Sequence, residues 1–185
     1  MSTAVASRPS GSAQASAAAA DTPCSLLRMA VGTDVLAVPI EDVREILQVA
    51  RMTPLPRTPG FIRGVMNLRG AVVPVIDLAA RLGQGHTTLG RRSCVVVVQT
   101  ACPQDAAGEA ATPPVVMGLL VDAVFEVFDR MGNEIEAAPA LGTHIEPHYL
   151  RGITRAGGQL ISVLSLAHVL STQSLASSIA SHVPH

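Results

Sequence analysis

What the sequence lacks excludes several classes of protein. The 185 residues include no lysine, no tryptophan and only three phenylalanines and one tyrosine, and the formal net charge is −1. A nucleic-acid surface uses clustered positive charge to hold phosphates and aromatic rings to stack bases, and this composition supplies neither. No apolar run approaches the roughly 20 residues that a membrane-spanning helix needs. We therefore expect no nucleic-acid partner and no direct membrane insertion.

Cysteine is also scarce. Cys24, Cys94 and Cys102 are odd in number and lack the close spacing of metal sites or disulfide frameworks, which indicates reduced residues in a cytoplasmic protein. Residues 1–22 are mainly small and polar and lack the leucine-rich stretch of a secretory signal. They favour a flexible extension over a transit peptide. Residues 172–185 are expected to form a C-terminal tail.

Catalytic motifs are missing as well. The chain has no nucleophile elbow, phosphate-binding loop, dinucleotide fingerprint or His-Glu-x-x-His signature. Asp77 could act as a general acid or base, but no partner group is evident, and a structural cap is the favoured interpretation. The alternating residues His144, Glu146 and His148 could present metal ligands on a strand face. Pro147 interrupts that strand and favours a solvated loop, so we expect no enzymatic activity, cofactor or metal.

The most informative feature that is present is an internal repeat. Residues 59–78 align without a gap with residues 147–166, an offset of 147 − 59 = 88 positions. A shorter match pairs residues 40–46 with residues 121–127, at an offset of 121 − 40 = 81. Apolar residues recur at matching places, which predicts the same core in both copies. The chain therefore reads as one small unit built twice.

Glycines recur at matching places too. Gly64 aligns with Gly152, and Gly70 aligns with Gly158. Because glycine adopts a positive φ without strain, we interpret all four as structural turn residues, and expect a positive φ at Gly70 and Gly158.

Short apolar segments separated by turn residues indicate an all-β chain. Expected strands lie at residues 25–29, 35–38, 44–49, 72–77, 95–99, 115–121, 125–129 and 160–164. Short helical turns are expected at 79–82 and 167–170, and residues 100–114 are expected to form an irregular loop. Two copies of such a meander most naturally close into two small barrels. The first would span about residues 25–90 and the second about 91–171, with some exchange of strands possible.

The motifs of the repeat resemble those of a known family. The most specific are the block Asn67-Leu-Arg-Gly70 and the segment Pro74-Val-Ile-Asp77. In this order they resemble the CheW-like family, the coupling proteins of bacterial chemosensory arrays, and the likeness places a CheW-like domain at residues 23–171. The resemblance implies an all-β fold of two tandem five-stranded SH3-like barrels, packed around a shared hydrophobic seam, with few short helices.

This resemblance implies a non-enzymatic adaptor. Members link the cytoplasmic tips of chemoreceptors, the methyl-accepting chemotaxis proteins, to the regulatory domain of a CheA-type histidine kinase. We expect a cytoplasmic protein that associates with membrane-bound receptor arrays, monomeric in isolation and a ring component in the array. The same role in a non-flagellar pathway, such as surface motility or cyclic-di-GMP control, is an alternative. A small ligand-binding β-barrel or enzyme is a remote one.

Candidate binding residues are implied by matching motif. Those for the receptor are Val43, Glu45, Arg69 and Val95, and those for the kinase are Glu136, Pro139 and Leu141. For the two valines a place in the core is the alternative. Arg69 stands where the second copy has Gly157, so this turn forms without arginine in one repeat. The mismatch favours a binding role for Arg69 over a requirement of the fold.

Overall fold

The computed structural model of the chain describes residues 22–100, 114–138 and 144–171. The expected N-terminal extension, apart from Thr22, and the expected C-terminal tail lie outside these ranges, as does all but the ends of the loop at 100–114. Among the described residues, no helix is long and apolar enough to cross a membrane.

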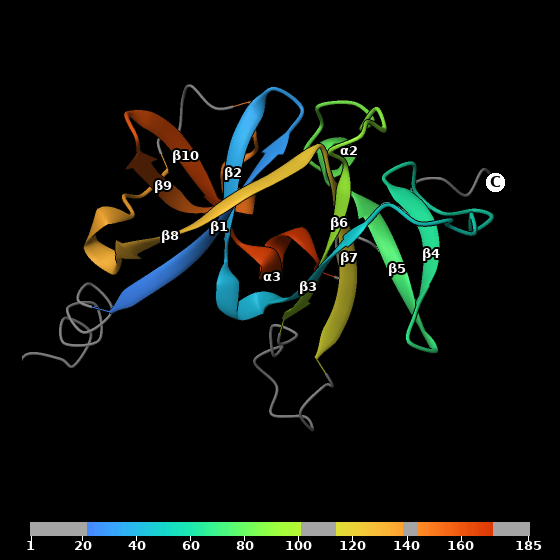
Figure 1. The fold of residues 1–185 in the computed structure, drawn as a ribbon. Helices are drawn as coiled ribbons and strands as arrows, with labels where there is room; N and C mark the ends of the chain where they lie inside the picture. Colours follow the sequence, from blue (N-terminus) through green and yellow to red (C-terminus); the bar gives the residue numbers. More distant parts are fainter. Residues whose placement is uncertain (1–21, 101–113, 139–143, 172–185) are drawn as a thin grey trace, which may run out of the picture.

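The described strands form two five-stranded sheets, which Figure 1 shows side by side. One sheet has the order β3-β6-β7-β5-β4, and we call it barrel 1; the other has the order β8-β1-β2-β10-β9, and we call it barrel 2. The strands of barrel 1 are β3 Val43–Gln48, β4 Ile62–Leu68, β5 Ala71–Asp77, β6 Cys94–Thr100 and β7 Val115–Val121. Those of barrel 2 are β1 Pro23–Val31, β2 Asp34–Pro39, β8 Ala123–Met131, β9 Leu150–Ala156 and β10 Gln159–Leu164.

Each sheet closes into a barrel through one isolated bridge between its outer strands. In barrel 1, Thr53, which follows β3, pairs with Val65 of β4. In barrel 2, Glu136, which follows β8, pairs with Ile153 of β9. The amide of the bridging residue donates to the strand carbonyl at 2.8 Å in both cases. The expected architecture of two five-stranded barrels is confirmed.

The barrels are not built from successive halves of the chain. Strands β1 and β2 belong with β8, β9 and β10, whereas β6 and β7 belong with β3, β4 and β5. The first two strands of each repeat therefore complete the barrel of the other repeat, and the sheets do not divide the chain near residues 90 and 91. The exchange depends on parallel pairing of β5 with β7 and of β10 with β2. A parallel pair cannot be joined by a tight turn, so no turn motif in the sequence indicates which strands pair.

Each expected strand overlaps an observed one, and the expected short helices appear as α2 Leu78–Arg81 and α3 Leu166–Val169. Single 3-10 turns are η1 Ile40–Asp42, η2 Gly132–Glu134 and η3 Pro147–Tyr149. Strands β4 and β9 are not among the expected ones, because each contains a glycine and polar residues that resemble a turn.

Those two glycines correct the sequence interpretation. Gly64 and Gly152 lie inside strands rather than in turns, each beside the residue that forms the closing bridge. A β-carbon on Gly64 would lie 2.3 Å from the carbonyl oxygen of Thr53, and one on Gly152 would lie 2.4 Å from that of Glu136. The close approach of a second backbone segment, not turn geometry, requires glycine here.

A shared core joins the barrels. One cluster of buried side chains includes Leu36 and Leu164 of barrel 2 together with Ile76 and Val96 of barrel 1. Apolar burial of this kind is the main stabilising contribution in a domain of this size. Because the core is continuous, the hydrophobic seam expected between the two units is confirmed.

The two copies of the repeat meet around a buried arginine. The guanidinium carbon of Arg81 in α2 lies 4.8 Å from the ring centre of Phe61 and 5.1 Å from that of Tyr149, which are equivalent residues of the repeat. Its Nε donates to the carbonyl of Val169, the residue equivalent to Arg81 itself, at 3.1 Å. Burial lowers the pKa of Arg81, with partial compensation by Tyr149 and Glu146. The arginine thus ties α2 to α3 across the junction.

Candidate functional site

The turn between β4 and β5 carries the first candidate residue. Arg69 and Gly70 have φ of 53° and 89°, close to the 58° and 78° of the equivalent Gly157 and Gly158. Positive φ at both central residues is what a type I′ hairpin turn requires, and residues with a β-carbon resist it. The positive φ expected at Gly70 and Gly158 is confirmed. Arg69 is therefore held in a conformation that glycine adopts with less strain.

An ion pair fixes the direction of this arginine. Nη2 of Arg69 lies 3.2 Å from Oε2 of Glu45 in β3, and the two side chains are 82% and 25% exposed. Pairs this exposed contribute about 0–1 kcal/mol to stability, so the contact matters more for position than for folding. Most of the guanidinium surface stays accessible to a partner.

A hollow of about 510 Å³ adjoins the pair, and we call it the β5 hollow. Its lining residues are Arg44, Glu45, Leu68, Arg69, Ala71, Val72, Val73 and Val116. Val72 is 69% exposed, the largest value among the large apolar residues described. Sequence reasoning missed this residue because residues 72–76 read as covered on both faces. The available signal was its place beside the turn, out of phase with buried Val73.

The two candidate valines differ in position. Val43 is half-buried at the start of β3, where it packs against the shared core. Val95 is 0% exposed and packs with Val75 and Leu120 inside barrel 1. Its strand, β6, lies between β3 and β7. Val95 therefore offers no surface to a partner, and the alternative interpretation, a place in the core, applies to this residue.

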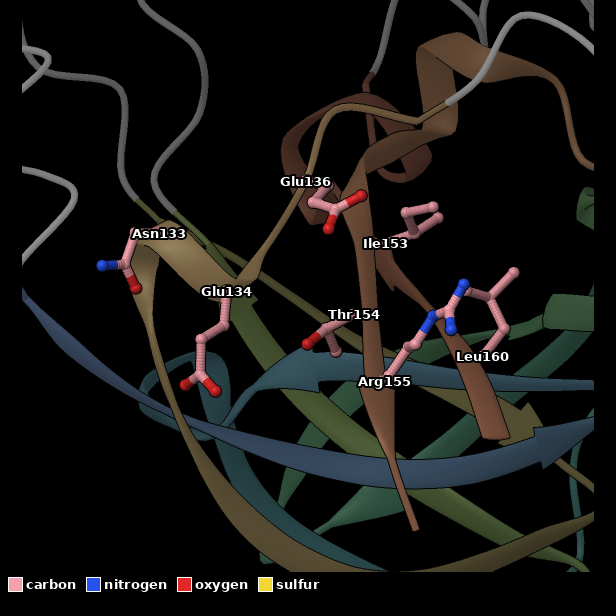
Figure 2. Close-up of a pocket in the computed structure, with 7 residues that line it drawn as sticks. All are labelled: Asn133, Glu134, Glu136, Ile153, Thr154, Arg155 and Leu160. Carbon is pink, nitrogen blue, oxygen red and sulfur yellow. The ribbon is translucent and has the colours of Figure 1, made fainter. Parts of the chain in front are cut away.

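Glu136, one of the candidates for the kinase, lies at the closing bridge of barrel 2, shown in Figure 2. Glu136 is exposed, and its backbone pairs with that of Ile153. Within the part of the chain that the structure describes, its carboxylate makes no hydrogen bond or ion pair, which leaves it available to a partner. Pro139 and Leu141 lie outside the described residues.

Beside Glu136 lies a second hollow of about 350 Å³, which we call the β9 hollow. It is lined by Asn133, Glu134, Glu136, Ile153, Thr154, Arg155 and Leu160. In Figure 2, Thr154 projects to the side of β9 on which Glu134 lies, and Arg155 projects to the other side. Oε2 of Glu134 accepts a hydrogen bond from the amide of Met131 at 2.7 Å. The hollow thus presents two carboxylates, the guanidinium of Arg155 and exposed Leu160, which suits a charged and partly apolar partner surface.

Asp77 is fully buried and acts as a cap. Its Oδ1 accepts from the amide of Ala80 at 3.3 Å and from the hydroxyl of Thr87 at 2.9 Å, and its Oδ2 accepts from the amide of Thr87 at 3.0 Å. The carboxylate thereby caps α2 and ties the following loop to it. The equivalent Ser165 makes no such cap on α3. These bonds support the structural interpretation of Asp77.

The histidines near residue 146 do not form the alternating ligand row. Pro147 and His148 belong to η3 rather than to a strand. Nδ1 of His148 lies 3.2 Å from Oε2 of Glu146, and both side chains are exposed. In the described ranges, no three His, Cys, Asp or Glu side chains are placed to hold a metal ion.

Comparisons with known proteins agree with this geometry. The sequence profile of the CheW-like domain matches residues 25–174. The chain is 32% identical over 148 residues to the chemotaxis protein CheW of Rhizobium meliloti, which covers 80% of this chain and 88% of that protein. It is 34% identical over 144 residues to the protein FrzA of Myxococcus xanthus, with coverage of 77% and 82%. The crystal structure of the scaffolding protein TtCheW from Thermoanaerobacter tengcongensis matches with a TM-score of 0.68 and 30% identity, covering 81% of this chain and 89% of that one.

Proposed function

The chain belongs to the CheW-like family, whose members are scaffolds and adaptors of chemosensory signalling, and we propose that its barrels use separate surfaces to couple chemoreceptor tips to a CheA-type histidine kinase. The adaptor is not an enzyme in this proposal. It is cytoplasmic, reaches the membrane only through the receptors, and is monomeric until it joins the array.

The receptor surface that we propose comprises Val43, Glu45 and Arg69, with Val72 added from the structure. A receptor tip is a helical hairpin, and an apolar helix face can lie over exposed Val72 while charged residues set its register. The observation that carries this assignment is the conformation of Arg69. One repeat keeps an arginine at a positive φ where the other uses glycine. Because the turn gains nothing from this strain, a binding role accounts for it.

The kinase surface that we propose comprises Glu136 of barrel 2 together with Pro139 and Leu141, which follow it in the sequence. The carboxylate of Glu136, which has no partner among the described residues, and exposed Leu160 support a contact there. Leu141→Arg should weaken kinase binding and ring assembly, because an apolar contact would have to accept an unpaired charge. Binding of a receptor-tip fragment should persist in the same variant. Parallel loss of both activities would contradict the separation of surfaces.

The receptor surface is tested by Arg69→Gly, which removes the side chain and relieves the positive φ. Loss of a charged interface anchor can cost about 2 kcal/mol of binding energy, so affinity for a receptor-tip fragment should fall about 30-fold. Thermal stability should be unchanged or slightly higher.

A matched control is Arg57→Gly, because Arg57 is the other described non-glycine residue with a positive φ, at 58°. This control removes an arginine and the same kind of strain away from the β5 hollow, and it should retain full receptor affinity. Equal loss in both variants, or unchanged affinity in Arg69→Gly, would overturn the assignment.

A second pathway remains a candidate, because similarity to FrzA at 34% identity is as high as similarity to a chemotaxis protein CheW at 32%. We therefore retain the same adaptor role in a non-flagellar chemosensory system as the alternative. Purification of the tagged adaptor from its own cells, followed by identification of the bound kinase and receptor, distinguishes the two pathways.

A further inference from the structure

The internal repeat gives the β5 hollow a counterpart on barrel 2. The aligned segments make Glu126 equivalent to Glu45 and Phe125 equivalent to Arg44, since 126 − 45 and 125 − 44 are both 81. The longer match makes Leu160 equivalent to Val72, since 160 − 72 = 88. Like Val72, Leu160 is an exposed large apolar residue. The backbone and part of the surface of the hollow thus exist twice.

Strand pairing identifies the equivalent residues of β6 and β1 opposite Glu45 and Glu126. In barrel 1, β3 pairs with β6 so that Val43 faces Val98 and Ile46 faces Val96. In barrel 2 the equivalent Val124 faces Met29, and the equivalent Val127 faces Leu27. Both pairings contain a register shift, and the two shifts lie at equivalent positions of the strands.

On the partner strand, the residue that lies between the two paired residues is Val97 in β6 of barrel 1 and Arg28 in β1 of barrel 2. Val97 is fully buried among other apolar side chains. Barrel 2 therefore has an arginine at the position where barrel 1 has a core valine.

The side chain of Arg28 contacts three residues around the counterpart of the β5 hollow. Nη1 lies 2.9 Å from Oε1 of Glu126, and Nη2 donates to Oε1 of Gln159. The guanidinium carbon lies 5.3 Å from the ring centre of Phe125. One planar guanidinium thus links β1, β8 and β10 on the part of barrel 2 that is equivalent to the β5 hollow.

Two further differences separate the hollows. In barrel 1 the acid Glu45 pairs with Arg69 on the exposed turn, whereas Glu126 is neutralised by an arginine from within its own barrel. The turn of barrel 2 has Gly157 in place of Arg69. The Nε of Arg28 is also enclosed and has no hydrogen-bond partner among the described residues, so stability alone is a poor reason for an arginine there.

We propose that Arg28 is a specificity-determining residue: it occupies the barrel 2 copy of the β5 hollow and so restricts receptor docking to barrel 1. This inference rests on the receptor surface proposed above. A scaffold with two open hollows would accept receptor helices on both barrels, one of which carries the proposed kinase contact. Closure of the second hollow from inside keeps that barrel free for the kinase.

The test is Arg28→Val, which gives β1 the residue that β6 has at the equivalent position. The probe is a helical-hairpin fragment of a chemoreceptor tip, and binding stoichiometry is measured by titration calorimetry with the backbone amide of Leu160 followed by NMR. Wild type should bind one fragment and leave the Leu160 signal unmoved. Arg28→Val should bind a second fragment, more weakly than the first because the turn of barrel 2 has Gly157 in place of Arg69, and shift that signal. Arg91→Val, which removes an exposed arginine that has no ion pair among the described residues, serves as the control and should behave as wild type.

A second variant guards against misfolding. Arg28→Lys keeps the charge but cannot bond Glu126 and Gln159 through one planar fork, so it should open the hollow partially and give weaker second-site binding. In Arg28→Val combined with Arg69→Gly, binding at barrel 1 should weaken while the barrel 2 signal still responds to the fragment. Folded Arg28 variants that bind one fragment, with Leu160 unmoved, would overturn the inference. Failure of wild type to bind the fragment at all would instead contradict the proposed receptor surface.

Discussion

Barrel 1 and barrel 2 share their backbone more closely than their interiors. Both close through an isolated bridge beside a glycine, and both turn through two residues with positive φ. Inside, however, Met66 of barrel 1 corresponds to Thr154 of barrel 2, since 154 − 66 = 88. Met66 belongs to an apolar cluster, whereas the Thr154 hydroxyl is buried with no hydrogen-bond partner in the described part of the chain. Close backbone contacts therefore constrain both copies, while the interiors are free to differ.

The largest effect is expected where both barrels are most alike. Gly64→Ala and Gly152→Ala should each destabilise the protein by about 3 kcal/mol or more, because the new methyl group would overlap a backbone carbonyl that cannot move without breaking the bridge. Gly64→Ala should be the worse of the two, since Gly64 also has φ of 137°. Urea unfolding measures both values. A loss below about 1 kcal/mol in either variant would show that the bridge can shift.

Met66→Thr makes the two interiors alike at this position, because it gives barrel 1 the polar residue of barrel 2. Loss of apolar volume and burial of a hydroxyl should cost about 2–3 kcal/mol. The control Met66→Leu keeps the apolar volume and should cost less than about 1.5 kcal/mol. If the two variants unfold at the same urea concentration, the interior of barrel 1 tolerates polarity as barrel 2 does.

Equal costs are expected at the two turns. Gly70→Val and Gly158→Val should each lose on the order of 1 kcal/mol or more, because a β-branched side chain resists a positive φ. A β-carbon on either glycine would meet no atom of another residue within 4 Å apart from its chain neighbours, so the loss reports backbone strain alone. Thermal melting of both variants beside wild type checks this. Unchanged melting of either would remove strain as the reason for glycine at that turn.

The smallest effect is expected from the opposite change, which makes the interior of barrel 2 more apolar. Thr154→Val replaces the unpartnered hydroxyl by a methyl group and should stabilise the protein by about 1 kcal/mol. The same change at exposed Thr33, in the turn between β1 and β2, should leave stability within about 0.5 kcal/mol of wild type. Destabilisation by Thr154→Val would mean that the hydroxyl is satisfied in solution, for instance by an enclosed water.

The repeat made the doubled all-β fold predictable, because matched glycines and apolar residues report local geometry that each copy forms by itself. An exchange of strands was given as possible, but which strands exchange was not predictable, since pairing of β5 with β7 joins segments that no turn connects. The run from Val95 to Val98 is apolar throughout, so periodicity could not tell a core residue from a surface residue. The positive φ of Arg69 could not be predicted from the residue itself, because arginine rarely adopts it. The only signal was the glycine at the equivalent position of the other copy.

The reciprocal exchange of hairpins also bears on how such a chain can be divided. A polypeptide that held only one repeat would carry a first hairpin with no barrel of its own to complete and a barrel lacking two strands. Two such polypeptides would complete each other by trading hairpins, as domain-swapped dimers do. In architectural terms the present chain is that dimer with its subunits joined end to end. Fusion of the subunits allows the two faces to diverge, which identical subunits could not do.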